Sequence, residues 1–416
     1  MFLYLLYFFI ALIVIQFVYY IGIFSKFSFT KPEAITPKNI PISVIVCAKN
    51  EEENVKEYIP ILAQQDYPTF ELVLIDDASS DETLEVFEAF EQQYPNIRLV
   101  KVKNNEAFWG NKKYALTLGI KAAKYEHLLF TDADCFPLTK DWITNMAAHF
   151  DRDKKIVLGY GGYTKVANSF LNKIIRYETV LTAIQYFSWA KSGRPYMGVG
   201  RNLAYKREVF FNVNGFIDHI QVRSGDDDLF INQAANKENT TIAYTPESFT
   251  YSEPKKTFKE WFNQKRRHVA TAEHYKWGDQ FQLGVFYCSQ LLFIVSAIVL
   301  LAFQFEWIIV ASLIAFRYLF TWISFGLGAK KLKEKLYIME VCGGHTHTIM
   351  KYGINQMMPD NIEFVHGPGC PVCIMPKGRI DAAIALAQME DTILVTLGDM
   401  IRVPGSKKSL SQIRGE

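Results

Sequence analysis

The residues best suited to chemistry in this 416-residue chain are acids that follow short apolar runs. Asp132 and Asp134 come directly after residues 128–131, which we expect to form a buried strand, and alternate residues of a strand face the same side. Both carboxylates then lie at the carboxyl end of the strand, where open α/β sheets bind ligands. Hard carboxylate oxygens suit Mg²⁺ or Mn²⁺, so the pattern predicts a divalent-metal site. An Asp-rich turn without metal is the alternative for this pair considered alone.

A second acidic cluster occupies residues 226–228, directly ahead of an apolar helical pattern. Like charges packed together raise the pKa of at least one carboxyl group, and such a group is better suited to proton abstraction near neutral pH. A capped helix start is the alternative, because acids favour the N-terminus of a helix in any case.

Thiols and imidazoles gather near the end of the chain. Cys342, His345, Cys370 and Cys373 lie on glycine-rich turns, and the six cysteines in total do not make a secreted disulfide framework. Soft thiolates beside histidine suit iron, copper or zinc, and a C-x-x-C pair also suits thiol–disulfide exchange. A purely structural C-x-x-C is the alternative.

The elements that must position the first two acidic sites begin at residue 41. Apolar strands are predicted at 42–47, 71–75, 97–102 and 127–131, and helices at 51–65, 81–93 and 112–124. Strands alternating with helices of this length predict an α/β fold with a mostly parallel, Rossmann-like sheet. Neither of the glycine-rich phosphate-binding motifs, G-x-G-x-x-G and G-x-x-x-x-G-K-[ST], occurs. The negative charge of a bound phosphate must therefore be neutralised in another way, and a metal ion on Asp132 and Asp134 would do this.

Composition and hydropathy indicate a membrane protein. A formal charge of +2 gives no nucleic-acid signature. Residues 1–25 contain no charge, and residues 283–303 and 307–328 are apolar and long enough to span a bilayer, with Arg317 expected to face a neighbouring helix or to snorkel. Lysines after the first and third segments place the central domain and the tail on the cytoplasmic side, in a bacterial inner membrane.

Four short motifs resemble family 2 glycosyltransferases of the GT-A fold. They are A-K-N-E-E at 48–52, D-D-A-S-S-D at 76–81, G-N-K-K-Y-A-L at 110–116 and D-A-D at 132–134. The resemblance implies that Asn50, Glu52 and Asp77 hold the nucleoside of a sugar donor. It also implies that Lys112 lies near the diphosphate, and that Asp132 and Asp134 carry the metal.

In the second half of the same region, further motifs resemble the segments of the family that bind the acceptor and carry the catalytic base. The family's acidic motif falls on Asp227 as catalytic base with Asp226 beside it, although Asp228 also fits some versions of the motif. Gln264 to His268 resembles the family's Q-x-x-R-W signature, with Gln264 and Arg267 serving the diphosphate. His268 stands in the position of the acceptor-binding Trp. Three residues of the resembling acceptor segment are Gly200, Arg201 and Asn202.

The tail resembles a different family, the HypD hydrogenase-maturation proteins. The resemblance rests on C-G-G-H-T-H at 342–347, G-P-G-C-P-V-C at 367–373 and L-G-D-M-I-R-V-P-G-S at 397–406. It implies that Cys342 is an iron ligand and that Cys370 and Cys373 form a redox-active pair, with His345 nearby. Both resemblances are interrupted near residue 335, which predicts a chimeric join. A half-domain of this kind is expected to be poorly stable or disordered.

The sequence therefore predicts a membrane-bound, inverting glycosyltransferase that uses a UDP-linked or similar sugar donor and a lipid or glycan acceptor. The expected parts are an anchor at 1–25, a linker at 26–40, a GT-A domain at 41–280, a membrane hairpin at 283–328, a basic linker at 329–335 and a HypD-like fragment at 336–416. One alternative is an iron-scaffold protein that acts through the tail with hydrogenase-maturation partners. Another is a non-catalytic sensor of sugar nucleotides.

Overall fold

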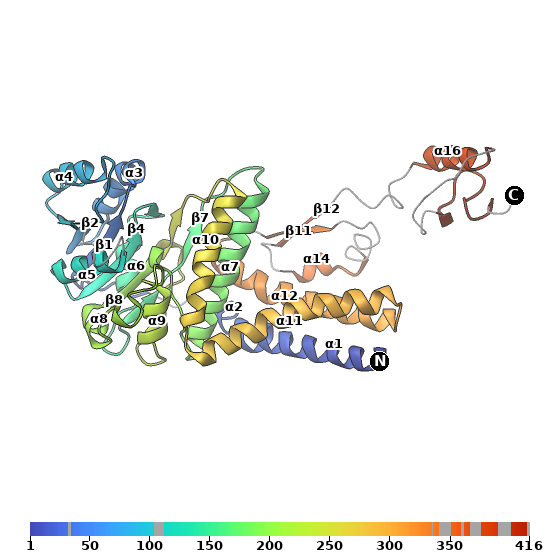
Figure 1. Cartoon of the computed structure of the whole chain (residues 1–416), viewed down its shortest axis with the longest axis horizontal. Helices are drawn as coiled ribbons and strands as arrows, with labels where there is room; N and C mark the ends of the chain where they lie inside the picture. The colour runs from blue at the N-terminus through green and yellow to red at the C-terminus, as the bar shows by residue number, and fades with distance from the viewer. Residues whose placement is uncertain are drawn as a thin grey trace. The chain divides into compact units, whose positions relative to one another are not determined.

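The computed structural model describes residues 1–31, 35–103, 112–334, 336–340, 351–358, 362–366, 376–389 and 401–413 (Figure 1). The chain divides into two compact units, Met1–Glu334 and Lys335–Glu416, which are treated separately below.

A seven-stranded sheet with the order β3-β2-β1-β4-β8-β6-β9 forms the centre of the first unit. The pairs on β1, β2, β3 and β4 are parallel, whereas β8 is antiparallel to both β4 and β6. These strands are β1 (Ile42–Ala48), β2 (Phe70–Asp76), β3 (Ile97–Lys101), β4 (His127–Asp132), β6 (Ile156–Leu158), β8 (Leu203–Lys206) and β9 (Thr240–Ile242). A second sheet holds β5 (Cys135–Pro137), β10 (Thr250–Ser252) and β7 (Gly161–Tyr163).

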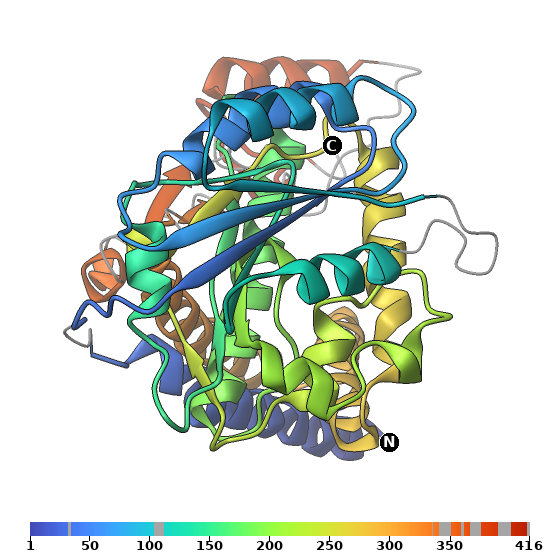
Figure 2. The same ribbon diagram turned by 90° about the vertical axis from the view of Figure 1, so that its left-hand side faces the viewer.

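Helices cover both faces of the parallel half of the sheet. In Figure 2, α3 (Glu52–Ala63) and α4 (Thr83–Gln93) lie on one side of the blue strands, and α5 (Lys112–Ala122) lies on the other. A strand that is covered on both faces is buried along its length and therefore consists almost entirely of apolar residues. Accordingly, six residues of β1 are buried. The predicted α/β fold with a mostly parallel sheet is confirmed.

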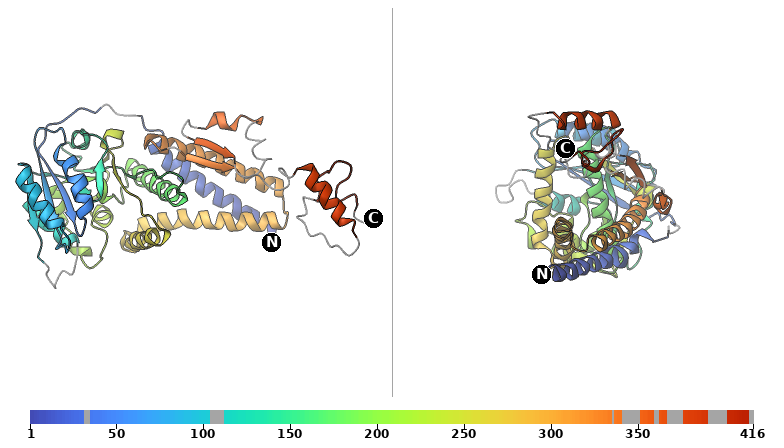
Figure 3. Two further views of the ribbon diagram at one scale, coloured as in Figure 1. Left: turned by 90° about the horizontal axis from the view of Figure 1, so that it is seen from above. Right: turned by 90° about the vertical axis from the view of Figure 1, so that its right-hand side faces the viewer.

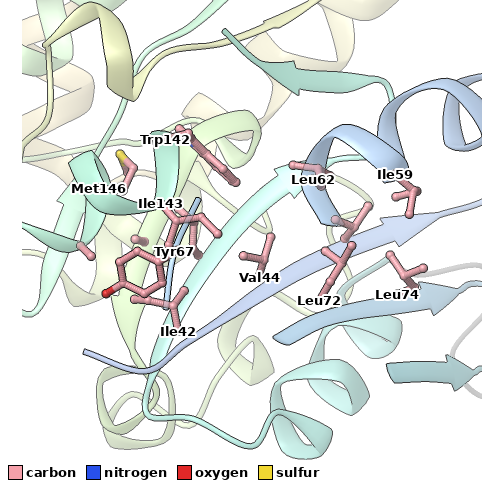
Figure 4. Close-up of a cluster of buried hydrophobic side chains, with 14 of the residues drawn as sticks. Ile42, Val44, Ile59, Leu62, Tyr67, Leu72, Leu74, Trp142, Ile143 and Met146 are labelled. Carbon is pink, nitrogen blue, oxygen red and sulfur yellow. The ribbon is translucent and has the colours of Figure 1, made fainter. Parts of the chain in front are cut away.

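One face of this sheet builds a continuous apolar core (Figure 4). Val44 of β1 and Leu72 of β2 contribute to it together with Leu62 of α3. Trp142 and Met146 extend it from α6 (Trp142–Ala147). The core ends where β1, β2 and β4 reach their carboxyl ends, so the polar residues that follow these strands stand on a rigid edge.

Three helices in the described part of the chain are long and apolar enough to cross a membrane. The first is a continuous run of α1 (Phe2–Phe17), the π-helical η1 (Val18–Phe24) and α2 (Ser25–Ser28). The others are α11 (Trp277–Ala302) and α12 (Trp307–Lys331). Figure 3 shows α1 running beside both of them.

Arg317 of α12 is buried between these helices, as expected for a charge within an apolar segment. Its Nε donates to Oε1 of Gln16 at 2.6 Å, and its terminal nitrogen donates to Gln290 of α11. The guanidinium also lies 4.6 Å from the centre of the Tyr318 ring. Arg317 thus joins all three apolar helices.

The remaining helices of the first unit connect the sheet to the apolar helices. The longest, α7, contacts both α2 and α12, and its Arg176 pairs with Glu334. These helices are α7 (Phe170–Lys191), α8 (Arg207–Asn212), α9 (Asp228–Ala234), α10 (Phe258–Thr271) and the short turns η3 (Gly200–Asn202), η4 (Ile217–His219), η5 (Pro246–Ser248) and η6 (Ala272–His274).

The described residues of the second unit form a parallel pair, β11 (Leu336–Glu340) with β12 (Ile362–His366), and the helices α14 (Ile354–Met357) and α16 (Lys377–Ala387). The four tail residues predicted to bind iron or to undergo redox chemistry, Cys342, His345, Cys370 and Cys373, lie outside the described residues.

Candidate active site

The predicted metal carboxylates come together at the end of β4. Asp132 is the last residue of the strand, Asp134 follows in the turn, and Cys135 opens β5. One ligand atom from each of these three residues lies within 4.8 Å of the others. Burial raises the pKa of the Cys135 thiol well above its usual range, so the thiol stays protonated and the two carboxylates are the ligands that suit a hard cation.

Lys112, the first residue of α5, joins the metal carboxylates to the acidic cluster. Its Nζ lies 2.7 Å from Oδ1 of Asp132 and 3.1 Å from Oδ2 of Asp226. Burial by itself lowers the pKa of this ammonium, but the two carboxylates outweigh burial and hold the pKa well above its ordinary value. The same ion pair outweighs burial at Asp132 and lowers the pKa of that carboxyl. At Asp134, burial together with the Asp132 charge raises the pKa, and they outweigh the charges of Arg201 and Lys255.

Asp227 sits at the start of α9 and accepts two backbone hydrogen bonds. Gly200 N donates to Oδ2 at 2.6 Å, and Asp228 N donates to Oδ1 at 2.8 Å, so Asp227 is the N-cap of the helix. Burial and the neighbouring charges of Asp226 and Asp228 raise the pKa of Asp227 to about 7. A small cavity of about 20 Å³ lies against Lys112, Asp226 and Asp227, with room for about one water molecule.

Asp228 is buried and its carboxylate is fully engaged with the protein. Thr271 and Tyr275 both donate to its Oδ2, the latter at 2.7 Å. Four residues further along α9, Asn232 donates to Asp279 of α11 at 2.8 Å. The acidic run thus caps α9 through Asp227 and brings Asp226 to Lys112. Asp228 ties α9 to Thr271 of α10 and to Tyr275, and Asn232 ties α9 to the first turn of α11.

The residues expected to hold a nucleoside lie at the carboxyl ends of β1 and β2. Asn50 has a left-handed backbone (φ 57°) and its Oδ1 accepts from Ser80 N at 2.8 Å. Asp77 lies 3.6 Å from Lys49, and burial raises the pKa of Asp77 despite that lysine. Glu52, at the first turn of α3, pairs with Lys56 at 2.5 Å on the helix surface.

On the expected acceptor side, the positive charge of Arg201 acts on both Asp132 and Asp134 in the direction that lowers their pKa. Its guanidinium lies 4.4 Å from the centre of the Tyr163 ring and 3.2 Å from Oγ of Ser252. Gln264 of α10 donates to the Tyr163 hydroxyl at 3.3 Å, which brings α10 to the same place. Arg267 and His268 are exposed on α10.

Asn202, the third loop residue expected on the acceptor side, is bonded within the core. Its side chain is fully buried, Oδ1 accepts from Trp142 Nε1 at 3.2 Å, and Nδ2 donates to the carbonyls of Tyr160 and Ser248. Oδ1 and both Nδ2 protons therefore bond within the core, so the side chain of Asn202 braces the loop that carries Gly200 and Arg201.

Residues 43–215 match the family model described as Glycosyl transferase family 2. The chain carries a family 2 glycosyltransferase domain. The match covers the metal carboxylates and ends ahead of the acidic cluster at residues 226–228.

One solved structure shows that the glycosyltransferase domain has the GT-A fold. A mannosyltransferase from Pyrobaculum calidifontis, PcManGT, in complex with GDP-Man and Mn²⁺, is 19% identical with a TM-score of 0.53 over 78% of this chain and 96% of its own. TarS of S. aureus is also similar, at 19% identity and a TM-score of 0.39 over 59% of this chain and 42% of its own.

The tail is similar to a different family. Residues 326–416 match HypD, described as the Hydrogenase formation hypA family. The hydrogenase maturation factor HypD of Escherichia coli is 56% identical over 82 residues, and that of Rhodobacter capsulatus is 50% identical over 82 residues. These stretches cover 20% of this chain and 22% of each relative, so the chain spans about a fifth of the length of the curated relatives it matches.

Several residues that shape the glycosyltransferase site were not singled out by sequence reasoning. Lys113 carried a usable signal, because it shares a helical face with Leu116 and Ile120 and therefore points into the core. The other residues reach the site through contacts with residues far away in the sequence, and no local sequence pattern predicts such contacts. These residues are Tyr163, His219, Thr271 and Tyr275.

Proposed function

We propose that this chain is a membrane-bound, metal-dependent, inverting glycosyltransferase that moves a sugar from a nucleoside-diphosphate donor, UDP-linked, to a lipid or glycan acceptor. The observation that carries the proposal is the grouping of Asp132, Lys112, Asp226 and Asp227 at the carboxyl edge of the sheet, within the glycosyltransferase unit. Metal carboxylates and a base of suitable pKa meet there.

Asp132 and Asp134 would hold Mg²⁺ or Mn²⁺, and the neighbour solved with GDP-Man and Mn²⁺ supports this assignment. A bound divalent ion would neutralise the diphosphate of the donor. Lys112 adds a second positive charge, and Arg201 a third that acts on Asp134 and Asp132. Gln264 and Arg267 are assigned to the same diphosphate. Such charges stabilise a leaving diphosphate more in the transition state than in the ground state.

Asp227 is the proposed base. A pKa of about 7 leaves a substantial share of the carboxyl ionised at neutral pH while keeping it basic enough to take the proton of an attacking hydroxyl. Asp226 is held by Lys112 and Asp228 by Thr271 and Tyr275, so the carboxylate of Asp227 is the least committed to side chains.

Separate groups of residues are assigned to the donor and to the acceptor. Asn50, Glu52 and Asp77 are assigned to the nucleoside, with Glu52 having to leave Lys56 to reach it. Gly200, Arg201 and His268 are assigned to the acceptor. The three apolar helices are assigned to a bacterial inner membrane, with the amino terminus outside and the catalytic domain on the cytoplasmic side.

The test is sugar transfer by membranes that contain the full chain. Membranes are supplied with labelled UDP- or GDP-sugars, with Mn²⁺ or with EDTA, and lipid and glycan products are separated. Asp227→Asn should lower turnover by about 10²–10⁴-fold, the usual contribution of a general base. Asp153→Asn, which changes an exposed acid on the loop between α6 and β6, is the matched control. Unchanged turnover in Asp227→Asn would remove the proposed base and favour the sensor alternative.

A second candidate function concerns the tail, on the strength of its 56% identity to HypD. In this alternative Cys342, His345, Cys370 and Cys373 carry iron or a redox-active pair, and hydrogenase-maturation proteins are the partners. Iron content of anaerobically purified protein tests it. Stoichiometric iron that disappears in Cys342→Ala but not in Cys288→Ala, an exposed cysteine of α11, would support the tail activity.

A further inference from the structure

Lys113 is a completely buried lysine that the proposed mechanism does not use. It is the second residue of α5, and its side chain has an exposed fraction of 0%. Its Nζ lies 2.8 Å from Nδ1 of His219, 2.7 Å from the His219 carbonyl oxygen and 3.0 Å from the Val222 carbonyl oxygen. The two residues that share these contacts are 106 positions apart in the chain.

These contacts fix the chain just ahead of the acidic cluster. His219 ends η4, and only the stretch from Ile220 to Gly225 separates it from Asp226. An ammonium group has three donors and no acceptor, so Nδ1 of His219 must accept and the ring proton lies on Nε2. The lysine therefore holds both the backbone and the side chain of the segment that leads to Asp226 and Asp227.

Two neighbouring lysines of α5 consequently hold two sides of the cluster. Consecutive side chains on a helix point about 100° apart. Lys112 reaches Asp132 and Asp226, whereas Lys113 reaches the segment ahead of Asp226. The position of α5 thus sets the position of the metal carboxylate and of the acidic cluster together.

We propose that Lys113 is a positioning residue for sugar transfer, which locks the segment 219–225 onto α5 and supplies a buried positive charge for the acidic cluster. This inference depends on the proposed function, since it concerns the placing and ionisation of Asp227 as base.

The electrostatic side of the proposal follows from the groups that face Lys113. Burial lowers the pKa of Lys113 to about 8, and Asp226, Asp228 and Asp227 act against that shift in this order. Interactions between charges are reciprocal, so the charge on Lys113 favours ionised Asp227. His219 also faces Lys113, and its pKa is lowered to about 4 by burial and by Lys113 itself, so it is neutral at working pH. A further charged group, Lys112, directly precedes Lys113 on α5.

The test compares three variants of the full chain in membranes. Lys113→Met removes the charge at similar volume, Lys113→Arg keeps a charge at all working pH values, and Lys121→Met is the matched control on the exposed face of α5. Lys113→Met should lower kcat by about 10²-fold, the effect of misplacing a catalytic group by about 1 Å, with little change in the KM of the donor.

The pH profile separates positioning from general loss of structure. In Lys113→Met the acidic limb of kcat/KM should move to higher pH, because Asp227 loses a nearby positive charge. In Lys113→Arg this limb should stay in place, and the fall in activity above about pH 8, where Lys113 itself loses its proton, should disappear. If Lys113→Met does not accumulate in the membrane, the loss of the alkaline fall in Lys113→Arg is sufficient to test the proposal.

Two results would overturn the proposal. The first is that Lys113→Met keeps the kcat of the wild type and the acidic limb of its pH profile does not move. The other is an alkaline fall in Lys113→Arg identical to that of the wild type. An inactive wild type would overturn the proposed function and this inference together, whereas an active wild type with unaffected Lys113 variants would overturn the inference alone.

Discussion

The Nζ atom of Lys112 lies 2.7 Å from Oδ1 of Asp132, one of the two carboxylates assigned to a metal ion. In the proposed site, a lysine and a metal ion would therefore share one carboxylate. The ammonium stabilises Asp132 in its ionised form, and it would compete with a bound metal for the same oxygen.

Replacing this lysine is expected to separate metal binding from transfer. Lys112→Met should bind free Mn²⁺ about fivefold more tightly, because a partly exposed ion pair is worth up to about 1 kcal/mol and no longer competes. Sugar transfer should fall at the same time. Electron paramagnetic resonance of free Mn²⁺ measures the affinity without turnover, and weaker Mn²⁺ binding in Lys112→Met would contradict the shared-carboxylate arrangement.

The pH dependence of transfer should report Asp227. Its pKa is raised from 3.8 to about 7, so the ionised base is present above pH 7 and is lost as the pH falls. We expect kcat/KM to drop about tenfold per unit below pH 7. An acidic limb near pH 4 would mean that Asp227 is not the base, or that it is not desolvated when substrates bind.

The anchoring of Asp228 predicts an effect on stability. Tyr275→Phe removes one of the two hydroxyls that donate to its buried carboxylate and should lower the free energy of unfolding by about 1–3 kcal/mol. Thermal unfolding in detergent measures this change. Tyr4→Phe, on the exposed surface of α1, is the control and should leave the unfolding temperature unchanged.

Arg317 predicts non-additive effects among the apolar helices. Gln16→Leu takes away the acceptor at 2.6 Å and leaves the guanidinium short of a partner, which should cost about 1–3 kcal/mol. The double replacement with Arg317→Leu should be less harmful than the sum of the two single changes. Strict additivity in the double-mutant cycle would show that the two side chains do not interact.

The join predicted near residue 335 is tested on DNA. Amplification of source DNA across codons 325 to 345 should yield no product from a single template if the chain is chimeric. A spanning product would establish a genuine fusion, and the tail would then merit iron-binding and thiol-redox assays. The ion pair between Arg176 and Glu334 lies on the amino-terminal side of the predicted join.

Local patterns predicted most of the sheet correctly. The strand expected at 71–75 is Phe70–Asp76, and the helix expected at 112–124 is Lys112–Ala122, because apolar periodicity is a property of neighbouring residues. The first carboxyl-terminal apolar helix begins at Trp277 and not near 283. Its first turn is fixed by Asn232, which accepts from Lys276 N, and hydropathy does not register such a contact.

In the candidate site, only the residues that directly follow a predicted strand could be predicted to lie together. Asp132 and Asp134 were brought together as expected, since both follow one strand. The burial of Asn202 was not foreseen, because it depends on Trp142, a residue 60 positions earlier. Lys113 and His219 meet for a similar reason, through packing of elements that are distant in the chain.

The hydrogen bonds from Tyr275 to Asp228 and from Asn232 to Asp279 make the acidic cluster part of the same rigid piece as the first turn of α11. Helices that cross a bilayer change their tilt when the hydrocarbon thickness changes. A change in the tilt of α11 would therefore reach Asp228, the residue next to Asp227 in the chain. We expect the turnover of this enzyme to vary with the acyl-chain length of the surrounding lipid, even when the lipid is not a substrate.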